Sequence, residues 1–266
     1  MRWAFLCAFV SLCLCAGLAP QAQAGIDLAY QPMRVDLRLT PGQTQTGVVQ
    51  LKNQGTQAIH LRGRMMDFVV SDDNTPQFVA RTDENYSCRS WTILNPVEVD
   101  IAPDSVVPFR YTVQVPATLV AESRTFRCAL TFESMPTLED RIQKRTTNQV
   151  RLVTVLYATV GSPAATPEIG NPEIRKTEDA WRLEIPFSNA GETHYRLNGQ
   201  VFIKDHDNHT IETLEMDSSP IQPATSVHVG FDIKALPQGE YTMLLQLNLG
   251  SKILEKEAIV EVLPSR

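Results

Sequence analysis

The side chains most able to do chemistry in this sequence are a histidine–aspartate run and two pairs of neighbouring carboxylates. The run from Asp205 to His209 carries oxygen and nitrogen ligands of the kind that bind zinc. Asp and Asn are also favoured turn residues, and further ligands are not evident, so a solvated hairpin tip is the preferred interpretation. The Asp-Asp pair at 72–73 and the Glu-Asp pair at 139–140 lie in polar stretches. Acid–base catalysis needs a tuned pKa in a cleft, which a solvated loop does not supply.

The motifs that usually carry catalysis are missing from the sequence. It contains no Gly-x-Ser-x-Gly nucleophile elbow, no His-Glu-x-x-His metal motif, and neither the phosphate loop nor the dinucleotide fingerprint. We therefore predict that the protein is not an enzyme and uses no cofactor or metal. A weak enzyme or metal protein would need a site assembled from residues that look ordinary in sequence.

The cysteines point to an oxidising compartment. Three of the five Cys lie within the first 24 residues, which leaves Cys88 and Cys128. An even pair in an exported chain favours a disulfide over a redox or metal site. Closing a loop of about 40 residues stabilises a domain by up to about 4 kcal/mol in the chain-entropy model.

The first 24 residues have the pattern of a cleaved signal peptide. Arg2 precedes an uncharged apolar stretch of about 17 residues, and Ala22-Gln23-Ala24 fits the small-x-small cleavage site. An uncleaved membrane anchor is the competing interpretation, but the stretch is short for a span.

The net charge of the mature chain bears on its partners. The 24 basic residues less Arg2 leave 23 against 30 acidic ones, a formal net charge of −7. Without a clustered basic footprint, nucleic acid is not an expected partner, and we expect no membrane insertion of the mature chain.

A short pattern occurs twice at a constant offset of 136 residues. Asn53-Gln-Gly55 followed by Gly63 reappears as Asn189-Ala-Gly191 followed by Gly199. Four apolar positions around the first copy fall on apolar positions around the second: Leu51, Ile59, Leu61 and Met65 on Phe187, Tyr195, Leu197 and Val201. The repeat predicts two tandem copies of one small domain, each with a strand, an Asn-x-Gly turn and a second strand.

Alternation of apolar and polar residues dominates both halves. Examples are Phe126/Cys128/Leu130/Phe132 and Tyr241/Met243/Leu245/Leu247, which place apolar side chains on one face of a strand. About seven strands in each half predict an all-β fold: two tandem immunoglobulin-like β-sandwich domains after a cleaved signal peptide. The expected boundaries are 1–24 signal peptide, 25–160 first domain, 161–172 a Pro-rich linker, and 173–266 second domain.

Several segments of the first domain, in order, resemble the amino-terminal domain of PapD-like periplasmic chaperones. They are Pro41-Gly42 before a strand ending at Asn53, Trp91 to Pro103, Phe109-Arg110-Tyr111, Ser123 to Phe126 with Leu130 to Pro136, and Val155-Leu156-Tyr157. The resemblance covers about residues 32 to 160. The second domain, with Leu236-Pro-x-Gly239-x-Tyr241, looks like a generic fibronectin-like or CARDB-like module.

The resemblance implies a periplasmic, non-enzymatic chaperone for pilus or surface-fibre subunits, with an outer-membrane usher as a further partner. Such chaperones lend the last strand of the first domain to an incomplete subunit, so that main-chain hydrogen bonds give affinity. Here the lent strand would run from about Val150 to Val160. A basic pair in the cleft between the domains usually anchors the terminal carboxylate of the subunit.

The sequence departs from the family pattern at the binding positions. Thr154 stands where the anchoring Lys is expected, and the donor positions before it are the polar Arg145, Thr147 and Gln149. The first-strand Arg position falls on Leu37, with Arg34 and Arg38 nearby. A basic run of Arg141, Lys144, Arg145 and Arg151 is either a solvated loop or a contact for an acidic or carboxyl-terminated segment. The residues expected to bind the partner are Arg34, Arg38, Val150, Arg151, Leu152, Thr154, Val155 and Tyr157.

A structural or adhesive cell-envelope protein, in which both sandwiches present surfaces, is the alternative function. A strand donor must leave the last strand of its first domain unpaired, whereas a structural module protects such an edge with charge or Pro. Residues 150 to 160 contain no Pro and only one charge, Arg151, which favours an edge meant to be paired. The polar stretch before Val150 favours the alternative.

Overall fold

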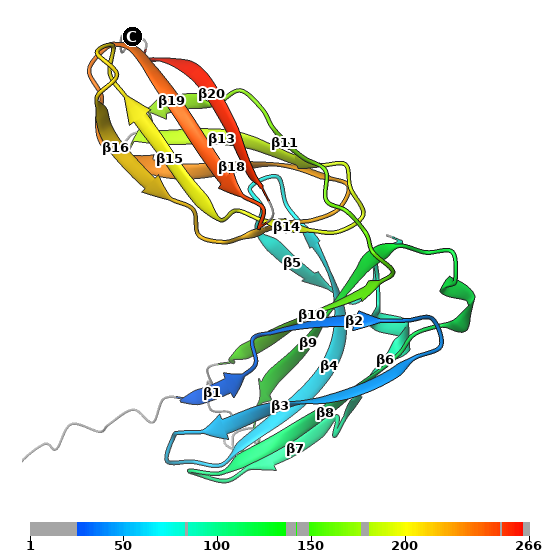
Figure 1. The fold of residues 1–266 in the computed structure, drawn as a ribbon. Coiled ribbons are helices and arrows are strands. Elements are labelled where there is room, and N and C mark those ends of the chain that lie inside the picture. The colour runs from blue at the N-terminus through cyan, green and yellow to red at the C-terminus, as the bar shows by residue number, and fades with distance from the viewer. Residues whose placement is uncertain are drawn as a thin grey trace, which may run out of the picture.

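The computed structural model describes residues 26–82, 85–136, 142, 149–176, 181–250 and 252–262 (Figure 1). The expected signal peptide, the carboxylate pair at 139–140 and three members of the basic run, Arg141, Lys144 and Arg145, lie outside the described residues. Thr147 lies outside them as well. The described chain forms two lobes of β-structure that follow one another in sequence, so the prediction of an all-β fold with two tandem sandwiches is confirmed.

The first sandwich packs two sheets face to face. One sheet has the strand order β1-β3-β8-β6, and the other has the order β2-β10-β9-β4-β5, with β7 paired to β4. The bounds are β1 Leu28–Gln31, β2 Arg34–Leu39, β3 Thr44–Asn53, β4 Ile59–Val70, β5 Pro76–Val79, β6 Thr92–Asn95, β7 Glu98–Ile101, β8 Val106–Gln114, β9 Arg124–Met135 and β10 Arg151–Val160, with the 3-10 helices η1 Arg89–Trp91 and η2 Ala117–Leu119.

The second sandwich also has two main sheets, but their strand orders differ from those of the first. One sheet has the order β11-β13-β12 with β18 on the other side of β13, a second has the order β16-β15-β19-β20, and β14 pairs with β17. The bounds are β11 Pro167–Ile169, β12 Glu173–Lys176, β13 Trp181–Asn189, β14 Tyr195–Arg196, β15 Gly199–Lys204, β16 Thr210–Glu215, β17 Pro220–Ile221, β18 Thr225–Ile233, β19 Gly239–Asn248 and β20 Ile253–Val262. The predicted linker, 161–172, includes β11, which pairs with β13.

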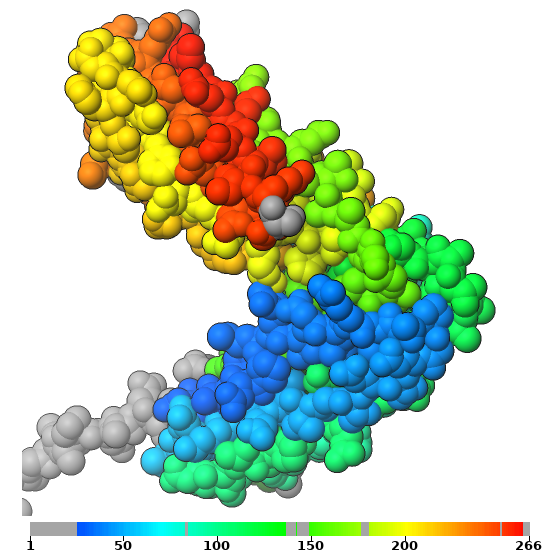
Figure 2. Space-filling view, in the orientation of Figure 1, coloured from blue at the N-terminus to red at the C-terminus, as the bar shows by residue number. Residues whose placement is uncertain are grey.

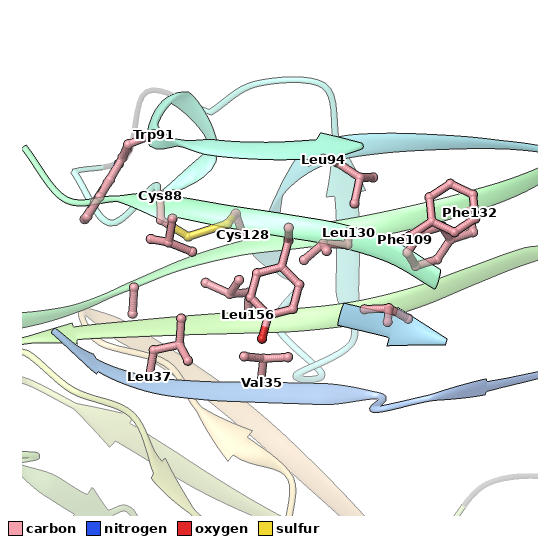
Figure 3. Packing of buried hydrophobic residues seen from close by; sticks show 14 of the residues in the cluster. Val35, Leu37, Cys88, Trp91, Leu94, Phe109, Cys128, Leu130, Phe132 and Leu156 are labelled. Atoms are coloured by element: carbon pink, nitrogen blue, oxygen red, sulfur yellow. A yellow bond between two sulfur atoms is a disulfide. The ribbon is translucent and has the colours of Figure 1, made fainter. Parts of the chain in front are cut away.

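Each sandwich has its own apolar core, built from the alternating residues that the sequence pattern singles out. In the first, Phe109 and Phe132 meet edge to face with ring centroids 4.8 Å apart, and Leu156 of β10 is fully buried in the same core (Figure 3). In the second, Leu245 and Leu247 of β19 are fully buried. Leu37, which holds the expected first-strand Arg position, packs into the first core, because its side chain lies on the inner face of β2.

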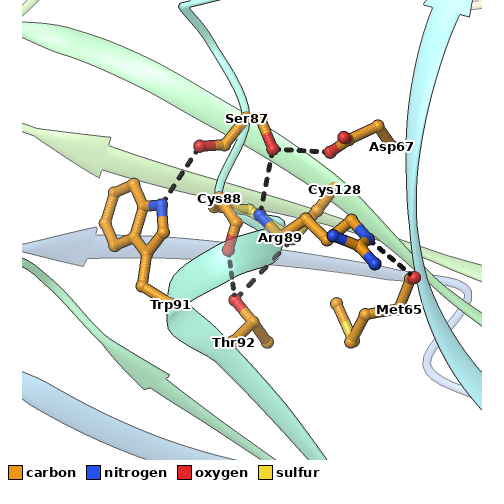
Figure 4. Close-up of a disulfide and its surroundings, with 8 residues drawn as sticks. All are labelled: Met65, Asp67, Ser87, Cys88, Arg89, Trp91, Thr92 and Cys128. Atoms are coloured by element: carbon orange, nitrogen blue, oxygen red, sulfur yellow. Dashed lines mark hydrogen bonds between the residues drawn. A yellow bond between two sulfur atoms is a disulfide. The ribbon is translucent and has the colours of Figure 1, made fainter. Parts of the chain in front are cut away.

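The predicted disulfide joins Cys88 to Cys128, with Cα atoms 5.4 Å apart (Figure 4). It ties the segment before η1 to the centre of β9. The segment is held further by Trp91, whose indole N–H donates to the Ser87 carbonyl at 3.1 Å, and by Thr92, whose hydroxyl donates to the Cys88 carbonyl at 2.8 Å. Both sulfur atoms are buried, so the bond is part of the first core.

Within the described residues, no helix has the length and apolar character needed to cross a membrane. The histidine–aspartate run forms a turn in which the Asp205 carboxylate accepts the backbone N–H groups of Asp207 and His209. No group of three His, Cys, Asp or Glu side chains in the described part of the chain is placed to hold a metal ion.

Candidate partner-binding edge and interdomain cleft

β10 is paired along its whole length on one side and along only part of it on the other. Its antiparallel partner β9 runs beside it from Arg151 to Val160. Its parallel partner β2 runs beside it only from Val155 to Val160. Residues 151–154 therefore lie at an edge of the sheet, and we call them the open edge of β10. The expected donor strand, Val150 to Val160, is already paired on both sides over its second half.

The hydrogen bonds show which backbone groups point off the open edge. The Val150 carbonyl accepts the Ser134 N–H of β9 at 2.9 Å, so even-numbered residues of β10 face β9. Odd-numbered residues face the other way, as Val155 shows by donating its N–H to the Met33 carbonyl at 3.0 Å. The N–H groups of Arg151 and Val153 consequently point away from β9, toward the side that β2 does not reach.

The end of β1 and the connection from β1 to β2 contact the open edge at Val153 and Thr154. The Tyr30 hydroxyl donates to the Val153 carbonyl at 2.9 Å, and the buried Thr154 hydroxyl donates to the Pro32 carbonyl at 2.8 Å. Thr154, at the expected Lys position, therefore holds this connection in place. For the N–H groups of Arg151 and Val153, we find no partner on that side among the described residues.

An apolar cluster lies on the outer face of the sheet beside the open edge. Val153 and Val155 are half-buried there against a small group of rings and methyl groups from β4, β5, β9 and β10. The group consists of Phe68, Phe78, Ala129 and Tyr157. Leu152 points to the opposite face and packs against the first core. Near the open edge, the sheet that an added strand would extend is thus apolar on both of its faces.

Two of the three candidate anchoring arginines are already paired. Arg34 bonds the Asp36 carboxylate at 2.7 Å, and Arg151 bonds Glu133 at 2.7 Å, with both guanidinium groups half-exposed. Arg38 is exposed on β2, beside Thr159 in register, and no hydrogen bond or ion pair to it is found among the described residues. Arg34 lies beside Val155, where the open edge ends. Arg151 lies at its other end.

The second sandwich sits over the far end of β9 and β10. The Thr125 N–H donates to the Glu192 carbonyl at 2.9 Å, and the hydroxyls of Thr125 and Thr193 are 2.7 Å apart. The tip of the β4–β5 hairpin also reaches across, because the Asp72 carbonyl accepts the His228 N–H at 2.6 Å. Figure 2 shows the two lobes meeting at an angle, with a concave side that opens to the left.

Tyr157 is the residue of β10 that joins the two sandwiches. Its hydroxyl accepts the Gln222 side-chain N–H at 3.0 Å, and its ring lies 4.2 Å from the His194 ring. Only 3% of the surface of Tyr157 is exposed, because its side chain packs against the second sandwich. It is therefore not available to bind a partner, contrary to the prediction from the sequence. Burial first, and the nearby Arg196 cation second, lower the pKa of His194 to about 4. The interface therefore holds a neutral His194 at neutral pH.

Residues of the second sandwich that reach the interface with the first sandwich were not predicted from the sequence. His194, Arg196 and Gln222 come from short turns and from β14, where alternation marks only Tyr195 and Leu197 as core positions. Nothing in the spacing of these residues relates them to β2 or β10. The positive charge of Arg196 was the one sequence feature that could have indicated a binding role, and charged residues are equally common in solvated turns.

No protein-family model matches this chain, and no curated protein matches it. Solved structures to which it is similar include a chain of the chaperone–tip adhesin complex of CFA/I fimbriae biogenesis, with 12% identity, TM-score 0.49, and 90% of this chain and 100% of that one covered. Another is the CsuC–CsuE chaperone–tip adhesion subunit pre-assembly complex of Acinetobacter baumannii, with 13% identity, TM-score 0.47 and coverages of 89% and 100%. A third is the E. coli chaperone DraB, with 13% identity, TM-score 0.42 and coverages of 89% and 98%.

Proposed function

We propose that the protein is a non-enzymatic periplasmic chaperone that lends the open edge of β10 to a β-sheet subunit of a pilus or surface fibre. The observation that carries the proposal is the half-paired state of β10, with the Arg151 and Val153 N–H groups pointing off the edge. Unsatisfied backbone groups in a row are a template for an added strand. The signal-peptide pattern in the first 24 residues supports an exported location.

The apolar cluster beside the edge supports the same proposal. A strand added to β10 would bring alternate side chains next to Val153 and Val155, both of which are half-buried. Main-chain hydrogen bonds would give affinity, and the fit of those side chains would give selection. The donor segment is shorter than residues 150–160, because β2 occupies the same side of β10 from Val155 onward.

The ends of the open edge suggest how a terminal carboxylate would be held. An added chain running parallel to β10 would end where β2 begins, against Arg34. An added chain running antiparallel would end beside Arg151. Arg38 lies four residues beyond Arg34, roughly 13 Å along an extended strand, which is too far from the open edge for either orientation.

A structural or adhesive role is the second candidate, and one observation favours it. The Arg151–Glu133 ion pair places charge at the open edge, which is a common way to protect an edge from pairing. Under this alternative, the Arg151 and Val153 N–H groups would stay solvated in every state of the protein.

The test is capture of the tagged protein from its native cells, with copurifying chains identified by mass spectrometry. Val153→Pro removes the N–H that points off the edge without removing a bond to β9, and Pro is tolerated at such edge positions. Val153→Ala keeps the N–H and is the matched control. We expect a stoichiometric β-rich partner with the wild type and with Val153→Ala, and its loss with Val153→Pro. Recovery alone, or a partner that all three forms retain, would refute strand donation.

A further inference from the structure

A pocket in the second sandwich is lined by cations and neutral hydrogen-bonding groups. Its cavity volume is about 440 Å³, within the range of small-ligand sites. Arg196 of β14 and Lys252, in the turn before β20, supply the charge, and Asn198, Ser218 and Asn248 supply polar groups. None of the described residues that line it carries a carboxylate, although acidic residues outnumber basic ones in the whole chain, 30 to 24.

The charge of Arg196 is poorly neutralised by the protein itself. A guanidinium has five N–H donors, and the hydrogen bond found for Arg196 in the described chain is one to the Ser218 carbonyl at 3.0 Å. Asp36, the nearby carboxylate, already bonds Arg34. Burial first, and repulsion by Arg34 second, lower the pKa of Arg196. An anion bound in the pocket would stabilise the charged form of Arg196 against burial and against repulsion by Arg34.

The walls of the pocket are held by backbone hydrogen bonds, so its shape exists before a ligand arrives. The Asn248 N–H donates to the Asn198 carbonyl at 2.7 Å, and the Leu249 N–H donates to the Lys252 carbonyl at 2.9 Å. The Asn248 side-chain oxygen accepts the Gly250 N–H at 2.8 Å, which leaves the amide nitrogen of Asn248 as a donor. Hydrogen-bond donors that line a pocket together with a cation favour oxyanion binding.

We propose that this pocket binds a carboxylate group, with Arg196 and Lys252 as the two cationic contacts. The carboxylate comes either from a free small acid or from the terminus of a bound peptide, and both sources present the same oxyanion to the same two cations. The proposal does not depend on strand donation, since the pocket is built from the second sandwich and the segment that leads into it.

Isothermal titration calorimetry of the full mature chain tests the proposal with four probes: succinate, acetate, acetyl-tetraalanine with a free carboxyl terminus, and the same peptide amidated. We expect saturable binding of at least one free carboxylate at one site. Arg196→Gln and Lys252→Gln should each weaken it by about tenfold, the loss of one charge-assisted contact. Lys234→Gln, an equal charge change at an exposed position, should bind as the wild type does.

The peptides distinguish the two sources. Tighter binding of the peptide acid than of succinate would assign the site to a chain terminus, and the reverse order would assign it to a free acid. Absence of saturable binding by every carboxylate, equal binding of the amidated peptide, or equal weakening in Lys234→Gln would overturn the proposal. Thermal unfolding of each variant shows that it is folded, and the capture experiment with Arg196→Gln reports strand donation separately.

Discussion

Asn53 and Asn189, 136 residues apart, make the same hydrogen bonds in the two sandwiches. In each, the side-chain oxygen accepts the N–H two residues later at 3.0 Å, from Gly55 and from Gly191. In each, the side-chain nitrogen donates to the carbonyl four residues later, at 2.7 Å and 2.9 Å, and to a distant strand. Both side chains are buried, so the repeated Asn closes the same turn over each core.

Replacing either Asn by Ala should therefore destabilise its own sandwich. Asn53→Ala leaves one N–H and two carbonyls without their partner, and Asn189→Ala leaves two N–H groups and two carbonyls. Such a loss costs about 2–4 kcal/mol in the free energy of unfolding. Urea unfolding of Asn53→Ala and Asn189→Ala, compared with the exposed Gln54→Ala, measures the effect. Values within about 0.5 kcal/mol of the control, the range typical of surface changes, would show that the turns do not depend on this amide.

Loss of the disulfide should weaken only the first sandwich. Cys88→Ser with Cys128→Ser removes a cross-link spanning 40 residues, and we expect a loss of about 2–4 kcal/mol. Trp91 lies in the first sandwich and Trp181 in the second, so single-Trp variants report the two unfolding transitions separately. The Trp91 transition should move and the Trp181 transition should not. Equal shifts would mean that the sandwiches unfold as one unit.

The interface should loosen in acid because of His194. Burial, with Arg196 as the second cause, lowers its pKa from 6.5 to about 4 in the folded state, so protons bind more tightly to the unfolded chain. The resulting stability is complete above pH 6.5 and is lost as the pH falls through that value toward 4. The loss attributable to this group is up to about 3 kcal/mol.

The measurement is the free energy of unfolding at pH 7 and at pH 4.5, for the wild type and for His194→Gln. The wild type should lose more stability on acidification than the variant. His206→Gln, at an exposed histidine on the hairpin tip, is the control and should follow the wild type. If His194→Gln and the wild type lose equal stability between these pH values, His194 does not carry the effect.

Substitutions at the two ends of the open edge test whether a bound strand runs parallel or antiparallel to β10. If the partner runs parallel to β10, Arg34→Gln should weaken its binding by about tenfold while Arg151→Gln has a smaller effect. An antiparallel partner should reverse that order. Arg38→Gln is the matched control, since Arg38 lies outside the reach of the open edge. A larger loss with Arg38→Gln than with the other two would contradict the proposed placement of the carboxylate.

Alternation in the sequence was sufficient to predict the strands and the core, because one buried face imposes a period of two. It places Tyr241, Met243, Leu245 and Leu247 on one face of β19, and all four are buried. The pairing of Cys88 with Cys128 followed from their number and from the predicted export. These features are local or depend on a simple count, so one sequence suffices for them.

The open edge could not be predicted, because it depends on where a distant strand begins. Val153 and Val155 look alike in sequence. Val155 has a strand on both sides and Val153 on only one, because β2 begins at Arg34, opposite Val155. Tyr157 likewise alternates like a core residue, yet it faces the second sandwich through Gln222 and His194. Such outcomes depend on contacts across more than 35 residues of chain, on which a local pattern carries no information.

Hydrogen exchange at two amides tests strand donation most directly. In the free protein, the Arg151 and Val153 N–H groups should exchange faster than those of Leu152 and Thr154, which face β9. In the complex with the captured partner, the Arg151 and Val153 amides should become protected, while Leu152 and Thr154 change little. If the Arg151 and Val153 amides exchange at the same rate with and without the partner, β10 is not the strand that this protein lends.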